Sequence, residues 1–233
     1  MDKNCRLYYN YKKEVGSLLE KMAEFFEARL DGYDVHMKTN IESAEEFYPF
    51  TAECLPKKSG CRVLDLGCGT GLELEDYFQL NPDAAVTGID LSGAMLDALK
   101  IKFPNRQLNL ICGSYFNVCL GEMYDAAVSV ESLHHFTMEE KLPLYTRLYN
   151  ALKPNGYFIL TDYFSQSEEE ETFFRGELLR LKQEQGICDN EFYHYDTPLT
   201  VEHEIQTLLA AGFRQVEVLN HWGSTYTLRA VKD

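Results

Sequence analysis

The sequence predicts an α/β fold built on a doubly wound, mostly parallel sheet. Short apolar runs alternate with segments of helical pattern, and the apolar runs are nearly continuous, as in strands that helices cover on both faces. A glycine-rich turn, Gly67-Cys68-Gly69-Thr70-Gly71, also stands between the first apolar run and a helical pattern. In open sheets of this kind, ligands bind at the carboxyl ends of the strands.

Strands and helices are expected to alternate through the core. Thr70 with Glu73 fits a capping box, in which side chains bond the free backbone N–H groups at a helix start. Thr137 with Glu140 fits a second one. Asn155 lies at a turn, where it can adopt left-handed backbone angles. Strands are expected at about 61–66, 85–89, 107–111, 126–130 and 157–162, with helices at 70–80, 92–102 and from 137 onward.

The rest of the chain is expected to add helices and a final strand pair. The pattern predicts helices over 15–30, 41–54, 168–185 and 200–211, an aromatic loop over 192–198, and antiparallel strands over 213–219 and 224–232. Gly212 would end the last helix. We therefore expect an N-terminal helical cap, 1–56, and a core, 57–233, with a helical lid insertion at about 164–212.

Composition narrows the class of protein. The 233 residues fit one domain with additions, and no apolar run is long enough to cross a membrane. The first residues lack the apolar core of a signal peptide. The net charge of −15, with no strong basic cluster, argues against bulk nucleic acid as a partner. Seven cysteines without metal-ligand spacing predict reduced thiols, no metal site and a cytoplasmic location.

The glycine turn lacks the spacing of two common phosphate-binding motifs. A dinucleotide fingerprint needs a third glycine where Leu72 stands, and a phosphate loop needs a Gly-Lys-Ser/Thr sequence. Asp65 lies two residues before the first glycine, where its carboxylate would repel a diphosphate. The acid instead suits a ligand that carries an ammonium or sulfonium group. A glycine-rich turn without any ligand is the alternative.

A second acid follows at the distance expected for ribose binding. Asp90 ends the second apolar run, 19 residues after Gly71, where a carboxylate can accept bonds from both hydroxyls of a ribose. The alternative role, capping the next helix, can be filled by Ser92. The pattern Asp-x-Gly-x-Gly-x-Gly, together with Asp90, resembles the class I S-adenosylmethionine (SAM) methyltransferases over about residues 60–163.

This resemblance implies a Rossmann-like, seven-stranded, mostly parallel sheet with an antiparallel last strand, and SAM as the cofactor. The family usually has an aspartate where Ser114 stands, so Tyr115 could provide the adenine contact instead. The cofactor-binding residues that the resemblance implies are Tyr33, Asp65, Gly67, Cys68, Gly69, Gly71, Asp90, Leu91, Ser114, Tyr115 and Glu131.

The segment after the fourth strand resembles the family's Leu-His-His segment. Glu131 would hold the cofactor or face the acceptor. His134 or His135 could act as a base because imidazole titrates near neutral pH. The alternative is that these histidines cap a helix or pack against the glycine turn.

The function that this resemblance implies is methyl transfer from SAM to a small molecule. Aromatic residues in 8–37 and 164–197 would form a lid over the acceptor, or alternatively pack the extra helices or a homodimer contact. The chain also resembles the enzymes that form carboxy-SAM for transfer-RNA modification, which would need a basic residue such as Arg175, Arg180 or Lys182. A SAM-binding regulatory protein without chemistry is a further alternative.

Overall fold

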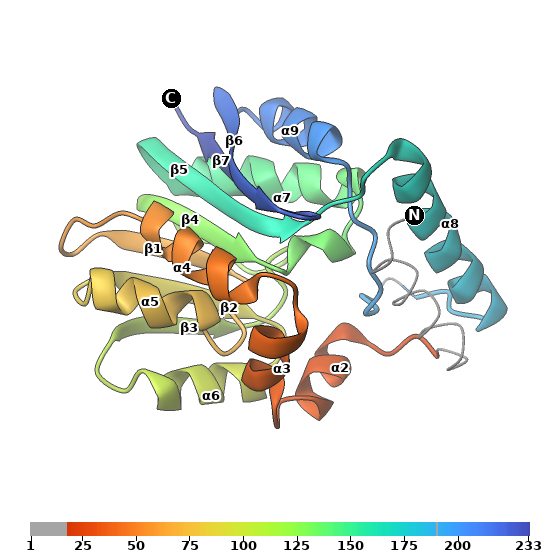
Figure 1. The fold of residues 1–233 in the computed structure, drawn as a ribbon, viewed down its shortest axis with the longest axis horizontal. Helices are drawn as coiled ribbons and strands as arrows, with labels where there is room; N and C mark the ends of the chain where they lie inside the picture. The colour runs from red at the N-terminus through yellow and green to blue at the C-terminus, as the bar shows by residue number, and fades with distance from the viewer. Residues whose placement is uncertain (1–17, 190) are drawn as a thin grey trace.

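A seven-stranded sheet forms the centre of the molecule (Figure 1), in the computed structural model, which describes residues 18–189 and 191–233. Its strands are β1 (Arg62–Leu66), β2 (Ala85–Asp90), β3 (Gln107–Cys112), β4 (Tyr124–Val130), β5 (Leu152–Tyr163), β6 (Gln215–Trp222) and β7 (Thr225–Val231). The strand order is β3-β2-β1-β4-β5-β7-β6. The first five strands pair in parallel, whereas β7 is antiparallel to both neighbours. The predicted fold class is confirmed.

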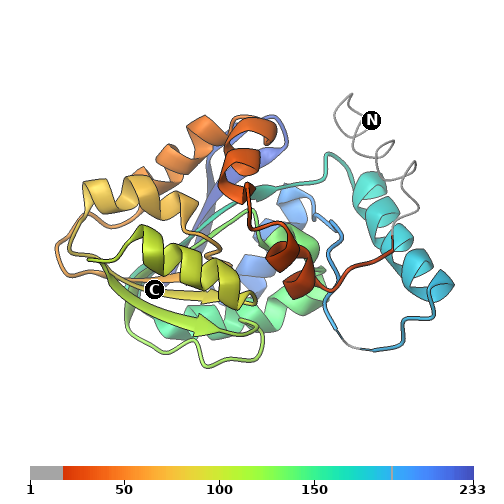
Figure 2. The same cartoon turned by 90° about the horizontal axis from the view of Figure 1, so that it is seen from below.

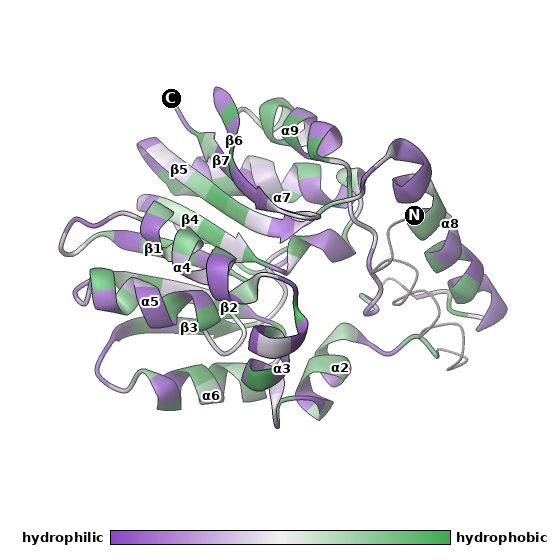
Figure 3. Ribbon diagram, in the orientation of Figure 1, coloured by the Kyte–Doolittle hydropathy of each residue, from purple (hydrophilic) through white to green (hydrophobic). Residues whose placement is uncertain are grey.

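Helices cover both faces of this sheet. The helices of the described part are α2 (Met22–Ala28), α3 (Tyr33–Asn40), α4 (Ala44–Cys54), α5 (Leu72–Leu80), α6 (Gly93–Lys102), the short 3-10 helix η1 (Leu133–His135), α7 (Met138–Ala151), α8 (Glu168–Glu184) and α9 (Val201–Ala210). One buried apolar cluster lies between the sheet and α4, α5 and α6, and a second lies between the sheet and α7 and α9. Figure 3 shows the apolar colouring along β4 and the middle of β5, as expected for strands buried on both faces.

Several helix ends follow from the local signals in the sequence. Ser92 accepts a hydrogen bond from the Met95 backbone N–H and so begins α6. The predicted capping box of Thr137 and Glu140 is present at the start of α7. Asn155 has a φ of 61°, the left-handed angle expected at its turn.

The predicted capping box of Thr70 and Glu73 is wrong. Helix α5 begins after Gly71, which has a φ of 74°, and no side chain caps it. The Thr70 hydroxyl donates to Asp34 at 2.5 Å instead, while Glu73 is buried. A contact with a distant segment has therefore replaced the local one.

The N-terminal helix is shorter than the predicted span 15–30. Residues 15–17 lie outside the described part, and α2 begins only at Met22, because Lys21 pairs with Tyr193 as an isolated β-bridge. The predicted helix over 41–54 begins at Ala44, and the sequence pattern did not indicate α3 as a separate helix.

Helix α8 lies apart from the two helical layers. Figures 1 and 2 show it set away from the sheet, on the side of the molecule where α2 also lies. The chain then returns to the sheet, where Ser165 N–H donates to Leu199 O at 2.9 Å. Within residues 18–189 and 191–233, every helix falls short of the length and apolarity that a membrane crossing requires.

Candidate functional site

A small cavity lies at the carboxyl ends of β1, β2 and β4. Its volume is about 40 Å³. The residues that line it are Met22, Phe26, Tyr33, Gly67, Gly69, Asp90, Met95, Val130, Glu131, Ser132 and His135. A larger, open hollow of about 500 Å³ follows residues 38–45, but no predicted site residue lines it. The cavity at the strand ends is therefore the candidate site.

The glycine turn has the backbone angles that only glycine adopts without strain. Gly67, Gly69 and Gly71 have φ angles of 75°, 46° and 74°. A Cβ on Gly67 would lie 2.0 Å from the Ser132 hydroxyl oxygen. Of these three glycines, Gly67 and Gly69 line the cavity. The turn therefore exposes backbone to the site, as a closely bound ligand requires.

Asp90 is held in place at the rim of the cavity. Its Oδ2 accepts a hydrogen bond from Gly69 N–H at 2.9 Å, and its Oδ1 accepts one from Ser92 N–H at 2.8 Å. Burial raises the pKa of this carboxyl. Each oxygen has a further lone pair, so the carboxylate can still accept from a ligand. Leu91, the next residue, packs against the apolar core.

Asp65 lies behind the turn and does not line the cavity. It is 1% exposed, and neither carboxylate oxygen has a hydrogen-bond partner among the described residues. Burial and the nearby Glu73 carboxylate raise its pKa well above the usual range, and burial raises the pKa of Glu73 to about 7. Cys68 is also buried, with its sulfur 2.7 Å from the position of a Cβ on Gly88. Asp65 and Cys68 therefore pack beneath the glycine turn and do not line the cavity.

Ser114 and Tyr115 lie beside the cavity without lining it. The Ser114 hydroxyl accepts a hydrogen bond from Phe116 N–H at 3.2 Å. The Tyr115 ring is 6% exposed, packs edge-on to Phe136, and lies with its hydroxyl 3.3 Å from that of Ser132. An adenine could stack on this ring only after a rearrangement. Their role in cofactor binding stays a prediction.

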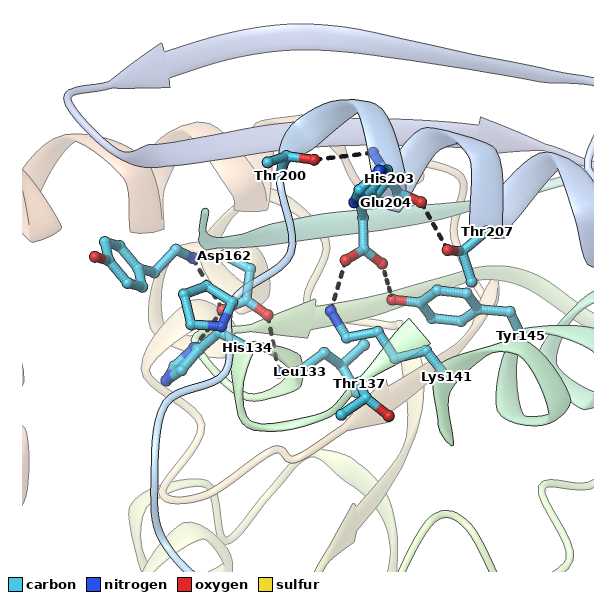
Figure 4. A network of polar contacts seen from close by, with 12 residues as sticks. Leu133, His134, Thr137, Lys141, Tyr145, Asp162, Thr200, His203, Glu204 and Thr207 are labelled. Carbon is cyan, nitrogen blue, oxygen red and sulfur yellow. Dashed lines mark hydrogen bonds and ion pairs between the residues drawn. The ribbon is translucent and has the colours of Figure 1, made fainter. Parts of the chain in front are cut away.

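The two histidines contact different carboxylates. His134 Nδ1 lies 2.6 Å from Asp162 Oδ1, while Asp162 Oδ2 accepts from Leu133 N–H at 2.8 Å (Figure 4). Burial opposes protonation of His134, but Asp162 outweighs it and the pKa rises to about 9. His135 Nδ1 lies 3.2 Å from Asp196 Oδ1, and burial lowers the pKa of His135. Of the two, only His135 lines the cavity.

The sequence pattern did not indicate Asp162 and Asp196 as members of this cluster. Asp162 stands at the carboxyl end of β5, next to β4, so its place near the histidines could have been inferred from strand order. Asp196 lies 61 residues after His135 in a loop, and no local spacing links the two. Tyr33, in contrast, was predicted and does line the cavity.

Segments far apart in the sequence meet over this site. Met22 N–H donates to Phe192 O at 2.9 Å, and the ring of Phe25 stacks on His194 with centroids 3.5 Å apart. Phe192 also packs on Phe116, with centroids 5.1 Å apart. Thus α2 and the loop after α8 contact each other beside the cavity.

Comparisons with known proteins show which families the chain resembles. Residues 63–156 match the family model of a methyltransferase domain. A carboxy-S-adenosyl-L-methionine synthase from Campylobacter concisus (strain 13826) is 28% identical over 210 residues, which are 86% of this chain and 86% of that protein. A malonyl-(acyl-carrier protein) O-methyltransferase from Priestia megaterium (strain DSM 319) is 30% identical over 111 residues, 46% of this chain and 39% of that protein.

The fold also matches solved structures. DesVI from Streptomyces venezuelae has a TM-score of 0.62 at 18% identity, covering 88% of this chain and 98% of that one. Residues 63–156 thus carry a methyltransferase domain, and the resemblance of the chain to the class I SAM-dependent methyltransferases is confirmed. The predicted family and its cofactor, SAM, are confirmed at this level. The acceptor and the residue roles stay predictions.

Proposed function

We propose that this protein transfers the methyl group of SAM to a small-molecule acceptor. The observation that carries the proposal is the cavity, where Asp90 and two glycines of the turn face His135 and the apolar side chains of α2. A polar ribose contact on one side and apolar walls on the other suit a cofactor beside a partly apolar acceptor.

The reaction would be an in-line displacement. The bond between sulfur and the methyl carbon breaks, the acceptor heteroatom bonds the methyl group, and the sulfur leaves with the electron pair as S-adenosylhomocysteine. Alignment and exclusion of water would supply most of the rate enhancement. Where the acceptor carries a proton, His135 is the lining side chain placed to receive it.

Binding of both ligands requires the site to open. A cavity of about 40 Å³ is far smaller than the roughly 300–1,000 Å³ of typical ligand sites. Met22 and Phe26 line it from α2, which the loop after α8 contacts through Phe192. We expect α2 and this loop to move together as a lid when SAM enters.

Methyl-labelled SAM tests the proposal. The protein is incubated with labelled SAM and the low-molecular-weight fraction of a cell extract, and mass spectrometry follows label transfer and S-adenosylhomocysteine. Label should appear in a small molecule with the wild type and be strongly reduced with Asp90→Ala. SAM binding without any label transfer would favour a regulatory protein instead.

Formation of carboxy-SAM is the second candidate, because the similarity to carboxy-SAM synthase extends over 86% of the chain. That product carries an added carboxylate, yet no Lys or Arg is among the lining residues of the cavity in the described part. Arg175 pairs with Glu139, and Arg180 with Glu177, on the exposed surface of α8. Incubation with SAM and prephenate distinguishes the reactions, since a product heavier than SAM would support carboxy-SAM formation.

A further inference from the structure

Two imidazoles and a carboxylate meet beside the cavity. Asp196 Oδ1 lies 3.8 Å from His134 Nε2 and 3.2 Å from His135 Nδ1. One ligand atom from each of the three residues lies within 4.8 Å of the other two. Ligand atoms that share a metal at bond lengths of about 2.0–2.2 Å stand roughly 3–3.5 Å apart. The two measured spacings, 3.2 Å and 3.8 Å, are close to those of a formed metal site, and binding through His135 Nδ1 would replace its contact with the Tyr195 carbonyl oxygen at 3.3 Å.

Asp162 orients the His134 imidazole through a hydrogen bond, as carboxylates commonly do for histidines that bind metals. Its Oδ1 lies 2.6 Å from His134 Nδ1, and its Oδ2 is fixed by Leu133 N–H (Figure 4). Histidines that bind metals commonly donate their second N–H to a carboxylate, which sets the tautomer and the ring orientation. With Nδ1 so engaged, Nε2 of His134 is the nitrogen directed toward Asp196.

Glu131 supplies an independent indication of a cation. Its Oε1 is buried and has no hydrogen-bond partner among the described residues. A carboxylate oxygen of Glu131 also lies within 4.8 Å of ligand atoms of His134 and Asp162. Three carboxylates thus lie around the His134 imidazole, and a buried carboxylate oxygen without a partner is costly. A divalent cation would compensate for both features.

We propose that His134, His135 and Asp196 bind one divalent transition-metal ion. Asp162 orients His134, and Glu131 lies near His134 and Asp162. Two imidazoles with carboxylates suit Zn²⁺, Mn²⁺, Fe²⁺ or Co²⁺ better than Ca²⁺ or Mg²⁺. Because His135 also lines the cavity, the ion would stand at the acceptor side, where a bound cation lowers the pKa of a hydroxyl that it contacts. With the ion bound, His135 serves as a ligand and the ion takes over its role in activating the acceptor. The site rests on ligand geometry and holds whether or not the chain transfers methyl groups.

Co²⁺ is the probe for the test because its visible spectrum reports coordination. Chelator-treated protein is titrated with CoCl₂ and followed by absorption and calorimetry in the absence of SAM. One ion should bind per chain, and Asp196→Asn and His135→Ala should each weaken binding at least about 10-fold. Asp162→Asn should weaken it less, since that residue acts through His134. The matched control is His203→Ala, because His203 Nδ1 contacts a different carboxylate, Glu171, at 2.9 Å.

Three outcomes would overturn the metal site. They are no stoichiometric Co²⁺ binding, equal affinity in the wild type and both ligand variants, and an equal loss in His203→Ala. Asp196→Asn preserves side-chain shape, so it decides the matter if His135→Ala fails to fold. A parallel titration with SAM keeps this result separate from the proposed function, because SAM should still bind to Asp196→Asn.

Discussion

At the scale of single residues, the site depends on glycines, which have no Cβ, as well as on the polar side chains around them. Gly67 allows the turn to lie against Ser132, where any Cβ would collide with the hydroxyl. The close approach leaves the backbone N–H of Gly69 free to bond Asp90. One carboxylate therefore both fixes the turn and faces the ligand site.

We expect Asp90→Ala to weaken SAM binding by about 2 kcal/mol or more, which is roughly 30-fold. The reason is that the carboxylate would accept charged hydrogen bonds from the ribose. Calorimetry with purified protein measures the change, with Asp97→Ala as the control because Asp97 is exposed on α6. Unchanged affinity in a folded Asp90→Ala variant would move the ribose contact elsewhere.

The buried pair of Asp65 and Glu73 makes stability depend on pH. Both pKa values are raised in the folded protein, so the folded state binds protons that the unfolded chain has released above about pH 4. Stability should therefore fall as the pH rises from about 4 through 7, where Glu73 titrates. Urea unfolding at several pH values measures this slope, and Glu73→Gln should flatten it. A slope unchanged in that variant would contradict the assignment.

At the scale of elements, a buried ion pair joins helices α7 and α9. Lys141 Nζ of α7 lies 2.5 Å from Glu204 Oε2 of α9, and the Tyr145 hydroxyl donates to the other oxygen (Figure 4). Lys141 is 1% and Glu204 0% exposed. Because α7 follows η1 directly, the pair also anchors the segment that carries the two histidines.

We expect Lys141→Met to destabilise the fold by about 3–5 kcal/mol, because it leaves the Glu204 carboxylate buried without its cation. Adding Glu204→Leu should recover most of that loss, since removing both charges avoids the desolvation cost. Urea unfolding of both variants measures this, with the exposed Arg180→Ala as a control that should change stability by less than about 1 kcal/mol. A double variant as unstable as the single one would contradict the explanation.

The loop after α8 should affect the acceptor more than the cofactor. Tyr195 is 8% exposed, and its carbonyl oxygen lies 3.3 Å from His135 Nδ1, whereas Tyr193 is partly exposed and bonds Asp189. We expect the double change Tyr193→Ala and Tyr195→Ala to abolish acceptor turnover while SAM affinity is kept. Label transfer and calorimetry measure the two quantities, and Tyr193→Ala alone is the control. Full turnover in a stable double variant would refute the lid for this loop.

At the scale of the whole molecule, features set by neighbouring residues could be predicted from the sequence, whereas features set by contacts between distant residues could not. The core strands and the capping residues Ser92 and Thr137 were predictable because apolar runs and caps are local. The start of α5 could not be predicted, because the Thr70 hydroxyl donates its hydrogen bond to Asp34, 36 residues away. Asp196 was missed for the same reason, since only the folded loop brings it to His135. The strand pattern therefore predicts the position of the site at the carboxyl ends of the strands, but not the side chains that distant loops add to it.

The negative net charge of the chain opposes binding to nucleic acid. The chain carries 22 Lys and Arg residues against 37 Asp and Glu residues, a balance of −15. Lys38, Lys102, Lys141 and Lys153 are among the basic residues that already pair with carboxylates. Binding to a phosphate backbone requires many unpaired cations on one face, and a net negative surface opposes the approach.

We therefore expect no appreciable affinity for bulk transfer RNA at physiological salt. Filter binding over a range of salt concentrations measures this, because each phosphate contact adds to the slope of log affinity against log salt. A basic RNA-binding protein measured in parallel confirms that the RNA is competent. A micromolar complex with a steep salt slope would contradict the prediction and indicate a cationic face. Absence of binding would agree with the proposed small-molecule acceptor, for which Met22 and Phe26 of α2 supply an apolar side of the cavity.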